Sequence, residues 1–343
     1  MLKTAVKEGT GLRLSDLLKN VKTLSGYRDT EITAVTGEIR KVTPGSVYIC
    51  KSKTLADVQS ASAAAVDAGA AAVISQIDSG SPNQVLVTDI NAAYSMICAS
   101  FFGNPAQKLK LIGITGTNGK TTTCFLLKNI FESIGIKTGI IGTVKNVVGD
   151  LVLEASSETP DPYELHSLFA EMVKQGCKYC VMEVSSQALS LKWVEGLNFA
   201  AAVFTNLSQN HLDYHGDFER YKAAKHILFE HTGLAIVNLD DDEAAYMMHG
   251  IDCPCVTFSV KTDASNYTAK NLRLKPSGAE YELVGKGVIG RVQFNVPEIF
   301  SVYNSMGAAV CAIEMGVPFR QVLEALADSK GGPDRLEGIP ENT

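Results

Sequence analysis

The strongest chemical signal in the chain is the stretch LIGITGTNGKTTT at residues 111–123. An apolar run leads into a glycine-rich turn, and apolar residues then recur at helical spacing as far as Gly135. Such a turn presents main-chain N–H groups and a helix N-terminus to a phosphate, while Lys120 adds positive charge and the Thr121 hydroxyl can reach Mg²⁺. Because Ile114 stands where the strict pattern has glycine, we predict a variant phosphate loop; a plain glycine turn with a surface lysine is the alternative.

Two later apolar runs end close to residues that could hold a metal ion. Residues 178–184 include Glu183 near their end, and residues 200–206 lie shortly before His211. Ligands of parallel sheets collect beyond the carboxyl ends of the strands, so we expect both side chains to face the phosphate loop. There they could hold the Mg²⁺ that neutralises a triphosphate. Taken singly, each residue is more commonly a solvated or internally bonded polar group.

Composition excludes several function classes. At 343 residues the chain exceeds one core of typical size, so we expect two or three domains. The net charge is −6 and we see no basic run, which argues against a nucleic-acid partner. No apolar stretch is long enough to cross a membrane, and the N-terminus lacks a secretory signal. We therefore expect a cytoplasmic protein with no membrane partner.

The eight cysteines are expected to be reduced. Cys177 and Cys180 are spaced like metal ligands, as are Cys253 and Cys255, but no histidines stand at zinc-finger spacing. We interpret all of them as small buried side chains or surface thiols.

The order of strand-like and helical patterns predicts an α/β fold. We expect a small N-terminal α/β domain over residues 1–104, a linker at 102–108, and a second domain from residue 105, which the family resemblance given below makes a central ATPase domain over 105–337. The second domain should have a mostly parallel sheet, because near-continuous apolar strands alternate with helices. The predicted strands are 31–35, 46–50, 71–75, 84–88, 136–143, 178–184, 200–206 and 234–238. The predicted helices are 57–70 and 162–175, followed by a β-ribbon at 266–296 and a closing helical stretch at 302–328.

Several motifs together resemble the Mur ligase family, and within it the ligases that add the third amino acid to UDP-N-acetylmuramoyl-L-alanyl-D-glutamate. They are ITGTNGKTTT, ETPDP, MEVSSQAL, FTNLSQNHLDYHG, YKAAK and VYN, in the family's order between about residues 30 and 337. The resemblance implies an N-terminal uridine-nucleotide domain, a central ATPase domain and a third domain that holds the incoming amino acid. It also implies a reaction in which ATP phosphorylates a carboxylate and an amine attacks the acyl phosphate.

The resemblance assigns roles to individual residues. Lys120 would bridge the β- and γ-phosphates, Thr121 and Glu183 would serve one magnesium ion, and His211 a second. Lys225 would be carbamylated, although the helical pattern alone makes it a surface lysine. The other implied contacts are to the nucleotide or the acid substrate. ATP would be bound by Gly116, Thr117, Asn118, Gly119, Thr122, Asn304 and Arg335, and the acid substrate by Thr159 and Ser185.

The departures from the family pattern gather on the side of the muramoyl peptide. Ile39 replaces a serine near the expected uridine site, and Trp193 replaces an arginine that should grip the substrate. Glu158 replaces a threonine and places a carboxylate where an anionic substrate should lie. Two like charges a few ångströms apart would cost about 1–4 kcal/mol at intermediate dielectric. We therefore predict weak or absent binding of UDP-muramoyl-dipeptide.

The sequence ends at Thr343, where the resemblance implies that the third domain begins. We expect that domain to be absent here, which makes a separate third domain a candidate partner. Three interpretations remain open: a tripeptide-forming ligase as a fragment, truncated copy or half of a split enzyme; a degenerate ATP-binding relative with a regulatory or partner role; and a ligase for a different acid.

Overall fold

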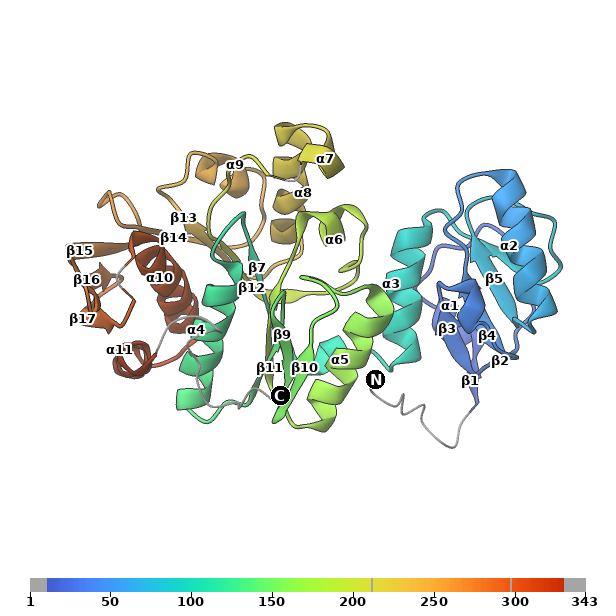
Figure 1. Cartoon of the computed structure of the whole chain (residues 1–343), viewed down its shortest axis with the longest axis horizontal. Coiled ribbons are helices and arrows are strands. Elements are labelled where there is room, and N and C mark those ends of the chain that lie inside the picture. The colour runs from blue at the N-terminus through green and yellow to red at the C-terminus, as the bar shows by residue number, and fades with distance from the viewer. Residues whose placement is uncertain (1–10, 211, 297, 330–343) are drawn as a thin grey trace. The chain divides into compact units, whose positions relative to one another are not determined.

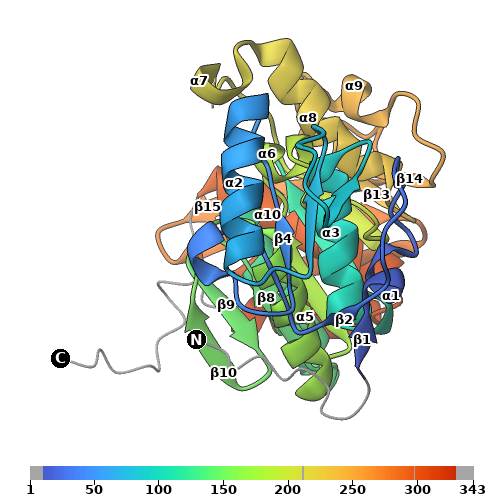
Figure 2. The ribbon, with the colours of Figure 1, turned by 90° about the vertical axis from the view of Figure 1, so that its right-hand side faces the viewer.

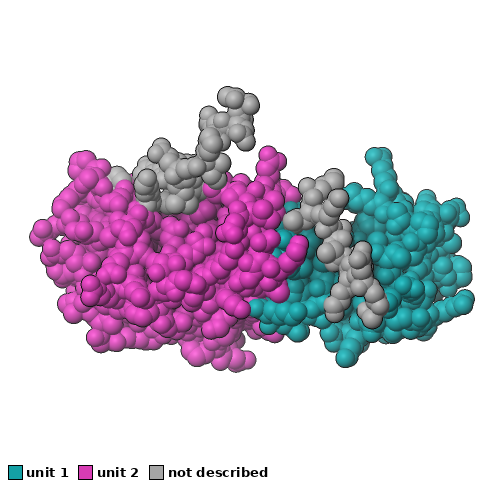
Figure 3. Space-filling view, turned by 90° about the horizontal axis from the view of Figure 1, so that it is seen from below, with its two compact units in different colours: residues 1–108, 160–171, 190–197 teal, residues 109–159, 172–189, 198–343 magenta. Residues whose placement is uncertain are grey.

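The computed structural model describes residues 11–210, 212–296 and 298–329, which form two compact units (Figure 3). Unit 1 contains residues 11–108, 160–171 and 190–197. Unit 2 contains residues 109–159, 172–189 and the described part of 198–343. Two later segments therefore group with the N-terminal residues, whereas the predicted domain boundary lies at 104/105. The assignment of functional domains stays a prediction.

Unit 1 is built on a parallel four-stranded sheet whose apolar strands are covered on both faces (Figures 1 and 2). Val47 and Ile49 pack with α3 (Ile90–Phe101), while Tyr48 and Cys50 pack on the other face with α2 (Leu55–Asp67). This alternation follows from the period of two along a strand. The strands are β3 (Ala34–Thr36), β4 (Ser46–Ile49), β5 (Ala72–Ser75) and β6 (Gln84–Leu86), in that order.

The remaining elements of unit 1 are short. Strands β1 (Leu12–Arg13) and β2 (Glu31–Ile32) pair antiparallel beside α1 (Leu14–Leu18). Two 3₁₀ turns, η1 (Ile39–Lys41) and η2 (Pro105–Lys108), also belong to it, and η2 falls in the predicted linker. Helix α3 is not among the sequence predictions. Its start is fixed by Asp89, whose carboxylate accepts from the N–H groups of Asn91 and Ala92.

Unit 2 contains an eleven-stranded sheet in the order β10-β9-β8-β11-β7-β12-β13-β14-β15-β16-β17. Every pair from β8 to β15 is parallel, and the pairs at the two ends are antiparallel. The predicted fold class is thus confirmed, and the β-ribbon continues the sheet. The strands are β7 (Lys110–Thr115), β8 (Thr138–Ile141), β9 (Lys145–Val148), β10 (Leu151–Glu154), β11 (Tyr179–Glu183), β12 (Phe199–Phe204), β13 (Ala235–Asn238), β14 (Cys255–Ser259), β15 (Tyr267–Lys275), β16 (Gly278–Gly285) and β17 (Val288–Phe294).

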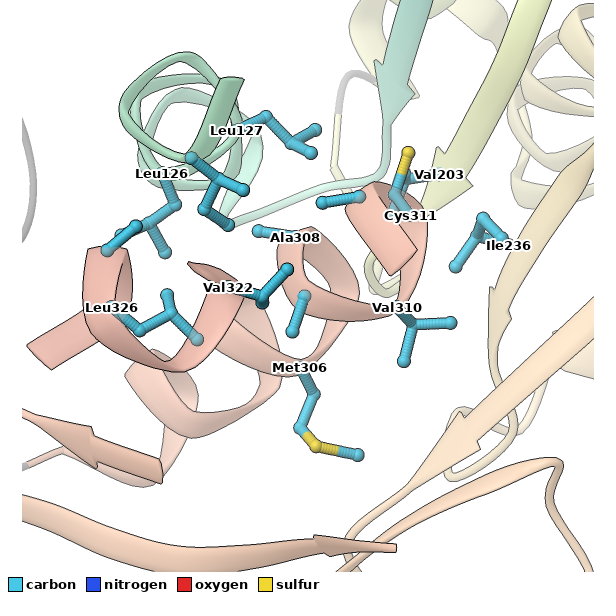
Figure 4. Packing of buried hydrophobic residues seen from close by; sticks show 14 of the residues in the cluster. Leu126, Leu127, Val203, Ile236, Met306, Ala308, Val310, Cys311, Val322 and Leu326 are labelled. Atoms are coloured by element: carbon cyan, nitrogen blue, oxygen red, sulfur yellow. The ribbon is translucent and has the colours of Figure 1, made fainter. Parts of the chain in front are cut away.

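Three helices form the main core of unit 2 with this sheet (Figure 4). Helix α4 (Lys120–Ser133) packs against α10 (Ile299–Glu314) and α11 (Phe319–Asp328). The prediction of one helical stretch over 302–328 is wrong at its middle. Gly316 adopts a φ of 92° and Pro318 precedes α11, so the chain turns between two helices.

The other helices of the second half are α5 (Pro162–Lys174), α6 (Ser186–Ser190), α7 (Leu212–His215), α8 (Phe218–Glu230) and α9 (Ala244–Met248). Helix α5 contributes residues to both units. Helix α8 packs against β7, where Leu228 lies over Gly113. Within the described residues, none of the helices combines the length and apolar character that a membrane crossing needs.

Candidate functional site

The phosphate loop, residues 116–121, joins the end of β7 to the start of α4. Gly119 is the N-cap of α4 with a φ of 86°, and it has no side chain with which to cap this helix start. The first N–H groups of a helix have no partner within it and carry a partial positive charge. An uncapped start at the carboxyl end of a buried parallel strand is therefore suited to an anion.

Two glycines are required by space as well as by backbone conformation. A Cβ on Gly116, whose φ is 146°, would lie 2.0 Å from the Thr205 hydroxyl. A Cβ on Gly119 would lie 2.2 Å from Oδ1 of Asn304, which comes from α10. The predicted nucleotide contact Asn304 is thus placed directly against the loop.

The loop is held in shape by the residues that follow β12. Asn206 Nδ2 donates to the carbonyl of Asn118, and Asn206 Oδ1 accepts from the N–H of Asn118, both at 3.0 Å. The Thr205 hydroxyl donates to the same carbonyl at 2.7 Å. Sequence reasoning missed both residues, although they end the predicted strand 200–206.

Lys120 is engaged by three oxygens. Its Nζ donates to the carbonyls of Gly116 at 2.8 Å and Thr117 at 3.0 Å, and lies 3.0 Å from Oε1 of Glu158. The side chains of Lys120 and Glu158 are only 12% and 25% exposed, so water screens this ion pair weakly. Glu158, which departs from the family pattern, therefore contacts the lysine of the phosphate loop directly.

Lys225 is buried, so the surface position suggested by the helical pattern is wrong. It lies on the side of α8 that packs toward β7, and its Nζ donates to the carbonyl of Gly116 at 2.9 Å. Burial, with the charge of Lys120, lowers the pKa of Lys225 to about 7, while Glu158 opposes the shift. Burial therefore favours the uncharged amine more than it would be favoured in an exposed lysine.

Glu183 ends β11 and is almost fully buried. Its Oε1 accepts from the Thr121 hydroxyl at 2.8 Å and from the N–H of Thr143 at 3.0 Å. The Thr143 hydroxyl donates to Oε2 at 3.0 Å. Burial raises the pKa of Glu183, and the bonds from Thr121 and Thr143 oppose that rise. Thr143 was missed as a site residue, although it ends the predicted strand 136–143.

The oxygen atoms around Glu183 are of the type that binds a magnesium ion. One carboxylate and two hydroxyls converge there, and oxygen atoms of this kind are the ligands that Mg²⁺ prefers. A cluster of three or more His, Cys, Asp or Glu side chains suited to a metal does not occur among the described residues. His211 and Arg335 lie outside the described residues, so their predicted roles stay predictions. All eight cysteines are free.

The two predicted substrate contacts already have internal hydrogen-bond partners. The Thr159 hydroxyl donates to the carbonyl of Glu183 at 2.9 Å and accepts from the N–H of Ser185 at 3.0 Å. The Ser185 hydroxyl accepts from the N–H of Ala188 at 3.1 Å, at the start of α6. Both residues brace the end of β11, and their contact with a substrate stays a prediction.

A cavity of about 180 Å³ adjoins the phosphate loop. The exposed ring of Phe300 and the ring of Tyr303 provide aromatic surface, and the Tyr303 hydroxyl donates to Asp240 at 3.0 Å. The sequence analysis missed most of the residues that line this cavity, although Asp240 closely follows the predicted strand 234–238. The lining residues are Asn118, Gly119, Asn206, Asn238, Asp240, Asp241, Lys261, Phe300, Tyr303 and Asn304.

The model of the Mur ligase middle domain matches residues 114–312, which contain the phosphate loop, Glu183 and Lys225. The chain belongs to the Mur ligase family. The resemblance read from the motifs is thereby confirmed, and residues 114–312 match that family's middle domain.

Curated relatives of this Mur ligase chain are UDP-N-acetylmuramoyl-L-alanyl-D-glutamate–2,6-diaminopimelate ligases. The protein from Clostridium perfringens is 37% identical over 325 residues, covering 92% of this chain and 67% of the relative. The one from Caldanaerobacter subterraneus is 38% identical over 321 residues, covering 92% and 66%. These chains extend beyond the part that is matched here.

Solved structures agree with this placement. A UDP-N-acetylmuramoyl-L-alanyl-D-glutamate–2,6-diaminopimelate ligase has a TM-score of 0.84 at 25% identity, covering 97% of this chain and 70% of the other. The MurF ligase from Thermotoga maritima in complex with ADP has a TM-score of 0.55 at 18% identity, covering 87% and 66%. The latter likeness concerns the fold alone.

Proposed function

We propose that this protein is an ATP-dependent ligase of peptidoglycan precursor synthesis. It would add the third amino acid to UDP-N-acetylmuramoyl-L-alanyl-D-glutamate through an acyl phosphate. The observation that supports this most directly is the meeting of Thr121 with Glu183 at the uncapped start of α4. The curated relatives, which are ligases acting on that acid, support the choice of substrate.

The proposed reaction has two steps. A substrate carboxylate oxygen attacks the terminal phosphorus of ATP, and ADP leaves, which gives an acyl phosphate. The amine of the incoming amino acid then attacks the carbonyl carbon, loses a proton and expels inorganic phosphate, which leaves an amide. The first step brings two anions together, so the protein contributes mainly by positioning them and by neutralising charge.

The phosphate loop would bind the anionic tail of ATP. The main-chain N–H groups at the start of α4 would face the phosphates, and Lys120 would supply positive charge at their far end. The residues of the adjoining cavity would hold the base and ribose, with Asn304 beside the loop. We therefore assign nucleotide binding to the loop and the cavity together.

Thr121 and Glu183 would hold a magnesium ion, with Thr143 keeping the Glu183 carboxylate in place. When bound, Mg²⁺ neutralises phosphate charge and lowers the barrier to phosphoryl transfer. Burial raises the pKa of Glu183, and a positive charge nearby favours the ionised carboxylate.

Lys225 would be carbamylated. An uncharged amine attacks carbon dioxide and then loses a proton, which converts a cationic side chain into an anionic one. The reaction requires an uncharged amine, and burial favours that form in Lys225 by lowering its pKa to about 7. Its Nζ lies against Gly116, so the new carboxylate-like group would form beside the phosphate loop.

The proposal is tested by assaying both products. The protein is incubated with ATP, Mg²⁺, UDP-N-acetylmuramoyl-L-alanyl-D-glutamate and 2,6-diaminopimelate, with and without the separately produced third domain of a curated relative. We expect phosphate release and the tripeptide product, detected by mass spectrometry, and neither with Lys120→Ala. Absence of product in the presence of that third domain would refute the ligase.

The ion pair between Lys120 and Glu158 favours a second candidate, a nucleotide-binding relative that does not ligate this acid. Calorimetry with UDP-muramoyl-dipeptide separates the two. Micromolar binding would refute the weak binding predicted from the sequence and would support the ligase, whereas absent binding together with retained nucleotide binding supports the second candidate.

A further inference from the structure

We propose that Glu158 stands in for the terminal phosphate of a nucleotide at Lys120, so that the site prefers a nucleoside diphosphate to a triphosphate. This inference rests on the proposed nucleotide site and concerns the relative affinity of ATP and ADP there; ATP remains the substrate of the proposed ligase. Glu158 thus becomes a residue that determines specificity rather than only a departure from the family pattern.

The first argument is the saturation of Lys120. An ammonium group has three protons, and Lys120 has three close oxygens, from Gly116, Thr117 and Glu158. In phosphate loops the lysine reaches the β- and γ-phosphates. The one oxygen of the three that belongs to a charged group is Oε1 of Glu158, so an arriving γ-phosphate has to compete with that carboxylate for the lysine.

The second argument is what displacement would leave behind. Oε1 of Glu158 is buried and makes no hydrogen bond within the described residues, so its stabilisation comes from the ion pair with Lys120. Separating the pair would leave a buried carboxylate oxygen beside the newly arrived phosphate. Because the Glu158 side chain is 25% exposed, this loss is smaller than for a fully buried charge, but it still opposes displacement of the carboxylate. A diphosphate bound at the start of α4 leaves the pair intact.

The third argument is that the backbone at Glu158 cannot easily move away from Lys120. Its neighbour Thr159 is buried, and the Thr159 hydroxyl is bonded to the main chain of both Glu183 and Ser185. These bonds tie the backbone next to Glu158 to the end of β11. The backbone next to Glu158 is therefore anchored, so the carboxylate can move away from Lys120 only by turning its own side chain.

The test compares ADP and ATP binding in three proteins at one fixed free Mg²⁺ concentration. Isothermal titration calorimetry gives the ratio of the dissociation constants of ATP and ADP for wild type, Glu158→Thr and Glu158→Gln. We expect wild type to bind ADP at least as tightly as ATP. In both variants we expect ATP to bind on the order of tenfold more tightly, with a much smaller change for ADP.

A matched control is Glu154→Gln, which removes an exposed carboxylate from β10 and should leave the ratio at the wild-type value. An unchanged ratio in both Glu158 variants would overturn the inference and leave the proposed function intact. If neither nucleotide binds to wild type or to the variants, the inference and the proposed nucleotide site fail together. A fall in ATP affinity in Glu158→Gln would also overturn the inference.

Discussion

Both units place charged residues near the carboxyl ends of parallel strands. These residues are exposed to water in unit 1 and buried in unit 2. After β3 in unit 1, Glu38 and Lys41 form an ion pair of 2.6 Å whose side chains are about two-thirds exposed. At the corresponding edge in unit 2, Glu183 and Lys225 are each 2% exposed. Water solvates the first pair at little cost, whereas the second set has been desolvated.

The consequence is chemical as well as energetic. Burial lowers the pKa of Lys225 to about 7 and raises the pKa of Glu183. In unit 1, the nearest parallel is Lys51, which lies 4.0 Å above the ring of Tyr94 and whose pKa burial lowers against the charge of Asp161. A cavity of about 300 Å³ lies beside Tyr94 and Asp161. The comparison teaches that burial shifts the pKa values of the charged groups at the edge in unit 2, whereas the Glu38–Lys41 pair, which lines this cavity, stays exposed to water.

The largest effect should come from Gly119→Ala. The new Cβ would lie 2.2 Å from Oδ1 of Asn304, and alanine would have to adopt a φ of 86°, so the Asn304 side chain or the loop has to shift. We expect loss of nucleotide affinity of at least about tenfold and a fall of about 1–3 kcal/mol in the free energy of unfolding. Calorimetry and urea unfolding measure the two effects.

The matched control is Gly135→Ala at the other end of α4. Gly135 has a φ of 77° but nothing within 4 Å of its Cβ position. It should lose about 1 kcal/mol in stability and keep its nucleotide affinity. Equal nucleotide affinity in the two variants would contradict the close fit at Gly119.

A smaller effect is expected for Glu183→Gln. The amide keeps an oxygen for Thr121 but loses the negative charge, so Mg²⁺ should increase nucleotide affinity about tenfold less than in wild type. Titration of nucleotide with and without Mg²⁺ measures this factor. Glu38→Gln in unit 1 is the control and should behave as wild type. The metal site is refuted if Mg²⁺ has the same effect in Glu183→Gln as in wild type.

Lys225 should make stability depend on pH in a defined window. Its folded pKa of about 7 lies below the unfolded value of 10.5, so between these values the unfolded chain binds the additional proton. The free energy of unfolding therefore rises with pH, by at most about 1.4 kcal/mol per pH unit from this group, and the contribution levels off below about pH 7.

Urea unfolding in carbonate-free buffer at about pH 7, 8 and 9 measures this dependence. The stability of wild type minus that of Lys225→Met should increase along the series, because the variant lacks the titrating group. A difference that stays constant with pH would show that Lys225 is not buried as a titrating amine.

The smallest effect is expected for Lys41→Ala. Its ion pair with Glu38 is exposed, so we expect unchanged nucleotide affinity and an unchanged midpoint of thermal unfolding. A clear loss of nucleotide affinity in Lys41→Ala would contradict the comparison of the two units, because it would show that the Glu38–Lys41 ion pair contributes to nucleotide binding.

Local pattern was enough for the elements that carry the loop. The apolar run of β7, the glycines of the phosphate loop and the periodic apolar face of α4 are consecutive, and each has its own signature in a short window. The same holds for β11, β12 and β13, whose buried positions in a parallel sheet require continuous apolar residues. Helix α3 and strand β14 were missed because their patterns are short or ambiguous.

The sequence by itself therefore determined the strand, turn and helix that build the phosphate loop, and the motifs that identify the family. The tertiary structure decided which side chains meet there. Thr121 contacts Glu183 across 62 residues, and Lys225 reaches Gly116 across 109. The order β11-β7-β12 and the packing of α8 on β7 create these encounters and bury Lys225. A local pattern records which face of an element is apolar, but not which partner covers that face or which charges are thereby removed from water.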